Sequence, residues 1–255
     1  DVNSDGRPDV LLSGDQLATG SGSTAGSGWT SAVPAQHRLL LNSPGGVLQP
    51  ATMRSIPEQS YCVSDAVNVD LDGDGDQDVV MATGCRFYNV NCGTAEPAFC
   101  RQNGVRIWMN DGAGGFTDST ATRFPAFTWS ATTLAAADFD KDGIVDLIVG
   151  TSGINPAATT TTDQYGVRLY KNNGAGVFTD VTYPRMPLQP QPVHTLAIID
   201  IDNDGAPDIY TGNDLGCSGV GRQRLYINTG NGFFLDVTPQ LPGTSNGNVP
   251  PLNTR

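Results

Sequence analysis

Basic residues, histidines and long apolar runs are all scarce in this sequence of 255 residues. Only 14 lysines and arginines stand against 26 acidic residues, which gives a net charge of −12. Nucleic acids and anionic membranes attract basic surfaces, so this balance argues against both partners. The longest apolar runs are far shorter than a bilayer requires, and we therefore expect no direct membrane insertion.

The signatures of a catalytic site are also missing. His37 and His194 are the only histidines, and neither belongs to a recognisable pair of nucleophile and base. The five cysteines lack the paired CxxC arms of a zinc site, and no phosphate loop or dinucleotide motif occurs. We therefore expect a protein that is not an enzyme and has no catalytic residues.

One segment of nine residues occurs four times, and each copy is called a cassette below. The copies are DVNSDGRPD at residues 1–9, DLDGDGDQD at 70–78, DFDKDGIVD at 138–146 and DIDNDGAPD at 200–208. Asp or Asn stands at positions one, three, five and nine and glycine at position six, a pattern that wraps oxygen ligands around a hard cation such as Ca²⁺. Fifteen of the 26 acidic residues occupy these positions. The acidity therefore belongs mostly to candidate metal sites.

The cassettes predict about four structural calcium ions. The expected ligands are the side chains at positions one, three, five and nine and the backbone carbonyl at position seven. They are Asp1, Asn3, Asp5, Arg7 and Asp9; Asp70, Asp72, Asp74, Asp76 and Asp78; Asp138, Asp140, Asp142, Ile144 and Asp146; and Asp200, Asp202, Asp204, Ala206 and Asp208. An EF-hand does not fit, because it needs flanking helices and a glutamate at position twelve, where this chain has Leu12, Met81, Val149 and Thr211.

Short apolar segments on both sides of the cassettes predict strands, and no segment predicts a helix. A third strand follows a variable loop, as in VRIWMN and VRLYKN, and a glycine turn then leads to a fourth, as in VFTDVT. Four short strands per repeat favour an all-β fold, a β-propeller of four-stranded antiparallel blades within one domain. The expected repeats span about residues 1–52, 63–120, 131–182 and 193–238, the first without its opening strand, and residues 239–255 form an irregular tail.

The cassette followed by DLIVG and then by VRLYKNNGAGVFTDVT resembles the FG-GAP/VCBS repeat family, which includes the calcium-binding propeller of integrin α chains. The resemblance covers nearly the whole chain. It implies a β-propeller, most often with seven blades, with structural Ca²⁺ between the first two strands of a blade. It does not imply one function. Four repeats leave two alternatives open: part of a larger propeller, or four blades that close in an unusual way.

The cysteines predict disulfides and an oxidising compartment. If the first two strands of the second repeat pair across its cassette, Cys62 lies opposite Cys85, which leaves Cys92 to pair with Cys100 and Cys217 unassigned. Disulfides and weak oxygen-ligand calcium sites are both typical of secreted proteins. We therefore expect a secreted or cell-surface protein, extracellular or periplasmic.

A ligand is expected at the end of the blades opposite the cassettes, where long loops emerge. The aromatic and arginine side chains there suit a protein or glycan, although they can also simply pack the loops. The candidates are Trp29, Tyr61, Arg86, Tyr88, Trp129 and Tyr165. The favoured function is an extracellular binding or adhesion module. The alternatives are a propeller domain of a secreted enzyme that acts on polysaccharide or lipid, and a structural subunit that contacts neighbouring subunits of a surface assembly.

Overall fold

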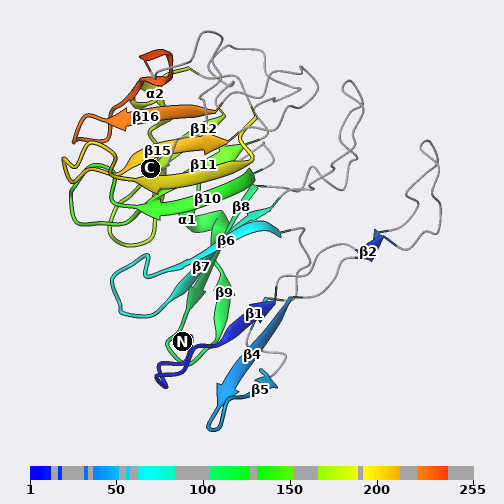
Figure 1. Ribbon diagram of the computed structural model, residues 1–255. Helices are drawn as coiled ribbons and strands as arrows, with labels where there is room; N and C mark the ends of the chain where they lie inside the picture. The colour runs from blue at the N-terminus through cyan, green and yellow to red at the C-terminus, as the bar shows by residue number, and fades with distance from the viewer. Residues whose placement is uncertain are drawn as a thin grey trace, which may run out of the picture.

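The chain forms antiparallel β-sheets that follow one another along the sequence (Figure 1). The computed structural model describes residues 1–12, 37–51, 56–57, 63–83, 104–126, 131–151, 166–188, 192–212 and 223–240, together with the backbone of 17–18 and 32–33. The first sheet has three strands, and the second, third and fourth sheets have four each. Strands β2 (Leu17–Ala18) and β3 (Ala32–Val33) form a separate pair.

Within the four large sheets, each strand pairs with the strand that follows it in that sheet. The first sheet consists of β1 (Val10–Leu12), β4 (Arg38–Ser43) and β5 (Val47–Pro50), and the second of β6 (Val63–Val69), β7 (Asp78–Thr83), β8 (Gly104–Asn110) and β9 (Phe116–Asp118). The third sheet consists of β10 (Ala131–Ala137), β11 (Asp146–Thr151), β12 (Val167–Asn172) and β13 (Phe178–Asp180), and the fourth of β14 (Thr195–Ile199), β15 (Asp208–Gly212), β16 (Arg224–Asn228) and β17 (Phe234–Asp236). This up-and-down order is that of a propeller blade.

The blades are copies of one another in register as well as in order. In the second, third and fourth sheets, an aromatic residue of the third strand stands opposite an aspartate of the fourth. These pairs are Trp108 with Asp118, Tyr170 with Asp180, and Tyr226 with Asp236. Residues at matching positions of different blades can therefore be compared directly.

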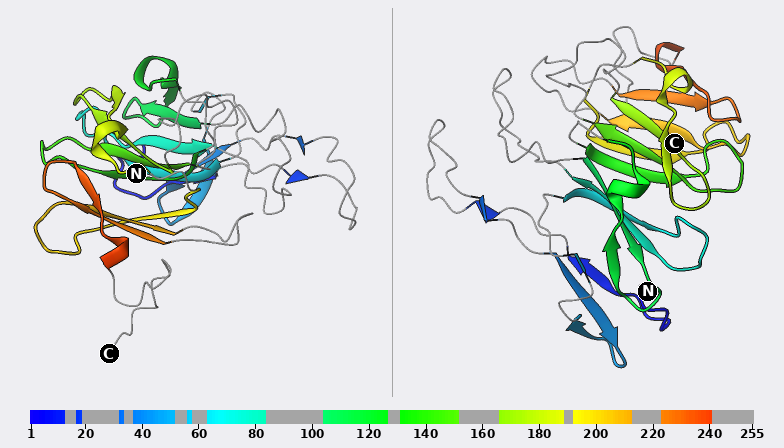
Figure 2. Two further views of the ribbon diagram at one scale, coloured as in Figure 1. Left: turned by 90° about the horizontal axis from the view of Figure 1, so that it is seen from above. Right: turned by 180° about the vertical axis from the view of Figure 1, so that it is seen from behind.

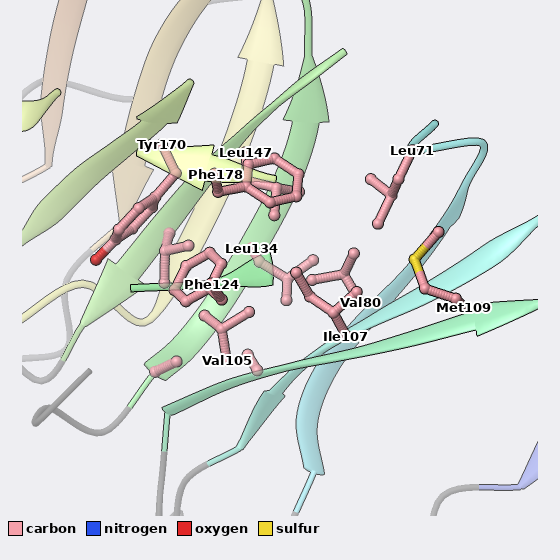
Figure 3. Packing of buried hydrophobic residues seen from close by; sticks show 13 residues of the cluster. Leu71, Val80, Val105, Ile107, Met109, Phe124, Leu134, Leu147, Tyr170 and Phe178 are labelled. Carbon is pink, nitrogen blue, oxygen red and sulfur yellow. The ribbon is translucent and has the colours of Figure 1, made fainter. Parts of the chain in front are cut away.

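The hydrophobic core lies between successive sheets. One cluster joins the first two sheets and includes Leu39 and the fully buried Trp108. A second cluster joins the second and third sheets, where Ile107 of β8 and Leu147 of β11 point toward each other (Figure 3). A third joins the last two sheets. A single blade would expose its apolar faces to solvent, so each blade depends on its neighbours for stability.

The first strands of the blades lie next to one another, as strands around a propeller axis do. Strand β10 contacts both β6 and β14. Within the described residues, the first and fourth sheets lie at opposite ends of the series (Figures 1 and 2). These two end sheets carry exposed apolar side chains, among them Leu48, Ile199 and Leu235. The fold is thus an all-β series of propeller blades.

The expectation of no helix was wrong at three matching places. Single helical turns follow the fourth strands: α1 (Thr120–Arg123), α2 (Thr182–Arg185) and a 3₁₀ turn at Thr238–Gln240. An aspartate two residues before the threonine starts each turn; Asp118 Oδ1, for example, accepts the backbone N–H and the hydroxyl of Thr120. Turns this short leave no hydrophobic period in the sequence. Residues 239 and 240, assigned to the irregular tail, belong to the third of these turns.

Several expectations fall outside the described residues. The five cysteines, residues 241–255 and the six candidate ligand contacts all lie there. None of the helices in the described ranges is long and apolar enough to cross a bilayer.

Candidate metal centres

The second, third and fourth cassettes connect the first and second strands of their blades, and the first cassette leads into β1. In the second, third and fourth cassettes, position nine is the first residue of the second strand: Asp78 begins β7, Asp146 begins β11 and Asp208 begins β15. In the first cassette, Asp9 directly precedes β1. The sheet therefore anchors one end of every loop.

The position-one carboxylate closes each loop from inside. The N–H of the glycine at position six donates to it, at 2.6 Å for Gly6 to Asp1, 3.0 Å for Gly75 to Asp70, 2.8 Å for Gly143 to Asp138 and 3.0 Å for Gly205 to Asp200. These glycines have φ values between 80° and 94°, a region that glycine enters without strain. Glycine at position six therefore allows the sharp turn that this hydrogen bond closes.

A second left-handed residue at position four was not predicted. Gly73 stands there in the second cassette, but the others have Ser4, Lys141 and Asn203, at φ values of 56°, 60° and 59°. Non-glycine residues are uncommon in this region, so their recurrence at three equivalent places shows that the loop conformation is strongly determined.

Three carboxylates come together in three of the four cassettes. They belong to positions one, three and nine, and the ligand atoms of each group lie within 4.8 Å of one another. The groups are Asp70, Asp72 and Asp78; Asp138, Asp140 and Asp146; and Asp200, Asp202 and Asp208. Like charges this close repel unless a proton or a cation neutralises them.

Oxygen atoms without a hydrogen-bond donor occur in two of these groups and in the first cassette. Four such oxygens are buried and accept no hydrogen bond from the described part of the chain. Three belong to position three, Asn3 Oδ1, Asp72 Oδ1 and Asp140 Oδ1, and the fourth is Asp146 Oδ2 at position nine. Buried oxygens without a donor are costly unless something else satisfies them. A cation fits this donor set, because it binds several oxygens at once and needs no proton from them.

In the second, third and fourth cassettes, the aspartate at position nine is the most buried of the predicted side-chain ligands. Asp78 and Asp146 are fully buried. Burial raises the pKa of Asp146 to about 7, partly offset by the hydrogen bond from the Asn172 N–H at 2.8 Å, and neighbouring Asp140 raises the pKa further. Burial likewise raises the pKa of Asp78. A bound cation would favour the charged form that burial disfavours.

The aspartates at position five are not part of the three-carboxylate groups. Instead, Oδ1 of each accepts the N–H of position seven, as from Asp76 to Asp74 at 2.9 Å and from Ile144 to Asp142 at 2.9 Å. The structure thus brings together three of the four predicted side-chain ligands in these cassettes. The roles of position five and of the position-seven carbonyls stay predictions.

The first cassette differs from the others. Asn3 occupies position three and donates through Nδ2 to Asp5 Oδ2 at 3.1 Å, and the guanidinium of Arg7 forms an ion pair with the same carboxylate. Two carboxylates therefore remain as metal ligands in this cassette, Asp1 at position one and Asp9 at position nine. Its capacity for a divalent ion is the lowest of the four on charge alone.

Basic side chains that contact the cassettes were not predicted from the sequence. Arg123, the last residue of α1, reaches Asp72 Oδ2 at 3.4 Å and also donates to the carbonyl of Ala175 in the next blade. Arg185, the last residue of α2, reaches Asp140 Oδ2 at 3.1 Å. The available signal was an arginine at the same place after two fourth strands. Each arginine contacts Oδ2 of the position-three aspartate and leaves Oδ1 free to face a cation.

Sequence comparison agrees with the blade structure. The chain matches the family described as FG-GAP-like repeat over residues 1–81, 93–149 and 157–211. No curated protein matches the chain significantly. The match covers more than half of the sequence and includes all four cassettes, and the resemblance noted from the cassettes is confirmed: the chain belongs to the FG-GAP-like repeat family.

Proposed function

We propose that this chain is a calcium-stabilised, non-catalytic β-propeller module that acts outside the cell and binds a protein or a glycan. The observation that carries the calcium part is the set of buried position-three oxygens without a donor, two of which lie in groups of three carboxylates. Ca²⁺ accepts six to eight oxygen ligands in flexible geometry, whereas Mg²⁺ demands a tight octahedron and keeps its waters. The all-oxygen cassettes therefore suit calcium better.

In this proposal the calcium is structural. Asp70, Asp72 and Asp78 hold one ion between the loop and the start of β7, and the matching residues of the other cassettes hold the rest, about four ions in total. The ion neutralises carboxylates that otherwise repel one another, so its binding energy stabilises the blade. The cassette side chains position the loop and exclude water from position nine.

The binding role is supported by the direction of the strands. Strand β7 begins at the cassette residue Asp78 and ends at Thr83, and β11 begins at Asp146 and ends at Thr151. The segments 84–103 and 152–165 therefore start at the ends of the blades away from the cassettes. Long connections on a rigid scaffold are the usual place of recognition. An extracellular location suits weak calcium sites, because calcium there is millimolar.

Thermal unfolding with and without calcium tests the structural role. We expect the melting temperature to fall substantially in excess chelator and to return on addition of CaCl₂, because the carboxylate groups lose their counter-ion. A melting temperature that stays the same in both conditions would refute calcium stabilisation. The calcium-loaded protein then serves as the probe on a glycan array and in pull-downs, which distinguish a glycan from a protein ligand.

A further inference from the structure

The third cassette has a lysine beside it that no other blade provides. In the four third strands, the residue directly before the terminal asparagine is Leu41, Met109, Lys171 and Ile227. Their strand partners are equivalent; Lys171 stands opposite Thr179 and Ile227 opposite Leu235. At this strand position, the third blade alone has a basic side chain.

The ammonium of Lys171 binds two predicted calcium ligands at once. Nζ lies 2.5 Å from Asp140 Oδ2 and 2.7 Å from Asp142 Oδ2, which are positions three and five. Burial favours the neutral amine, but the hydrogen bonds to the two carboxylates outweigh it and raise the pKa of Lys171, so the side chain is charged. The same contact lowers the pKa of Asp142.

The fourth cassette has the same ligand residues without such a cation. At position five, Asp204 Oδ1 accepts the N–H of Ala206 at 2.7 Å, and the nearest ammonium, that of Lys141, lies 3.9 Å from it. Asp202 Oδ1 accepts the N–H of Asp204 at 3.3 Å, and Ile227 stands where Lys171 would be. The two cassettes have the same predicted ligands but differ in their cations: Lys171 and Arg185 contact carboxylates of the third, whereas Lys141 donates to the backbone carbonyl of Asp204 in the fourth at 3.0 Å.

We propose that Lys171 is a tethered cation that competes with calcium for Asp140 and Asp142, so that the third cassette binds calcium more weakly than the fourth and depends on it less. This inference rests on the proposed calcium binding. The ammonium holds Oδ2 of both carboxylates, and a positive charge held beside the site repels a divalent ion. A unit charge about 6 Å from a dication changes its binding constant about tenfold even at the dielectric constant of water. In the calcium-free protein, Lys171 partly replaces the missing ion.

An exchange of side chains between the two blades tests the proposal on the full chain. Lys171→Ile gives the third blade the residue of the fourth, and Ile227→Lys does the reverse. Both positions are half-buried, so each new side chain meets a similar environment. Calcium titrations followed by the amide signals of Gly143 and Gly205 in ¹⁵N-¹H spectra report each site separately, because each amide donates to the position-one aspartate of its own cassette.

The expected results are opposite for the two variants. Lys171→Ile tightens calcium binding at the Gly143 signal about tenfold, leaves the Gly205 titration unchanged, and lowers the melting temperature only in chelator. Ile227→Lys weakens binding at Gly205 by a similar factor. Lys171→Arg, which keeps the charge, is the control and retains weak binding at Gly143.

The outcomes separate this inference from the proposed function. If no glycine signal of the wild-type protein responds to calcium, calcium binding itself is refuted and the tethered cation with it. If Gly143 responds with the same midpoint in the wild-type protein and in Lys171→Ile, calcium binding stands and the role of Lys171 is refuted.

Discussion

The side-chain amide of Asn172 donates a hydrogen bond of 2.8 Å to the backbone carbonyl of Leu71, the second residue of the preceding cassette. The same amide donates to Val145 in its own cassette at 3.0 Å. Its Oδ1 accepts the N–H groups of Gly174 and Gly176 in the following turn. Asparagines at the equivalent place in the neighbouring blades do the same, from Asn110 to Val2 and from Asn228 to Phe139. One residue thus joins two successive cassettes.

Replacement of Asn172 by alanine is expected to destabilise the protein. The change leaves two carbonyls and two N–H groups without their partner in a buried place, a loss of about 2–4 kcal/mol in the free energy of unfolding. Urea unfolding in saturating calcium measures it. Asn42→Ala is the matched control, because Asn42 Oδ1 accepts no hydrogen bond within the described residues and Pro44, at the place of Gly174, has no N–H to offer. If Asn42→Ala lowers the free energy of unfolding as much as Asn172→Ala does, the proposed role of Asn172 between the blades is wrong.

Two glycines in the turn between β16 and β17 allow the cost of backbone strain to be distinguished from the cost of a steric clash. Gly230 and Gly232 have φ values of 88° and 77°, so alanine is strained at both. A Cβ at Gly232 would lie 2.8 Å from Phe139 Cδ2, whereas at Gly230 the nearest atom would be 3.8 Å away. We expect Gly232→Ala to cost about 1–3 kcal/mol more than Gly230→Ala, because the buried Phe139 cannot retreat. Chemical unfolding of the two variants decides it, and equal losses would show that the blades separate easily here.

The stabilisation by calcium is expected to grow with pH. The pKa of Asp146 in the calcium-free fold is about 7, raised from 3.8, so this carboxyl contributes stability below pH 3.8 that is lost as the pH rises through about 7. Calcium requires the carboxylate form. The increase in melting temperature on calcium addition is therefore small near pH 5 and large near pH 8.

Comparison of calcium-saturated with calcium-free protein at each pH isolates this effect. Burial lowers the pKa of His37, which makes the fold less stable below pH 6.5, but this contribution is the same with and without calcium and cancels in the difference. An increment that does not depend on pH would show that Asp146 keeps its charge without the ion.

Local sequence signals were sufficient for the strands and the cassettes. Apolar alternation, glycine turns and the spacing of aspartates act within about ten residues, so they can be recognised without knowledge of the fold. They correctly indicated strands such as VRLYKN, which forms β12. They did not indicate that Asp142 would bind its own loop and Lys171 in place of joining the carboxylate group.

Contacts between blades could not be predicted in this way. Asn172 and Leu71 are 101 residues apart, and their hydrogen bond exists only when two blades stack. The same holds for Arg123, whose side chain spans from its own cassette to the next blade. An asparagine at the end of a strand gives no hint of a partner in another repeat, because its role is set by packing and not by its neighbours in sequence.

The second position of the cassette offers a test of the dependence between blades. Leu71 is 2% exposed and packs between the second and third sheets, whereas Ile201, at the same position of the last cassette, is 45% exposed. The backbone N–H of each donates to the position-nine aspartate of its own loop, at 3.0 Å and 2.9 Å. Leu71→Ala leaves a cavity and is expected to cost about 2–4 kcal/mol. Ile201→Ala removes exposed surface and is expected to cost less than about 1 kcal/mol.

Urea unfolding of both variants in saturating calcium measures the two costs under one condition. Since the local loop geometry is the same, a difference between them reports the contribution of the following blade alone. Similar costs would mean that the face of the fourth sheet around Ile201 is covered in solution as Leu71 is covered by the third. In that case a concentration dependence of the Ile201→Ala loss would show whether the cover is a second molecule, because only an intermolecular contact weakens on dilution.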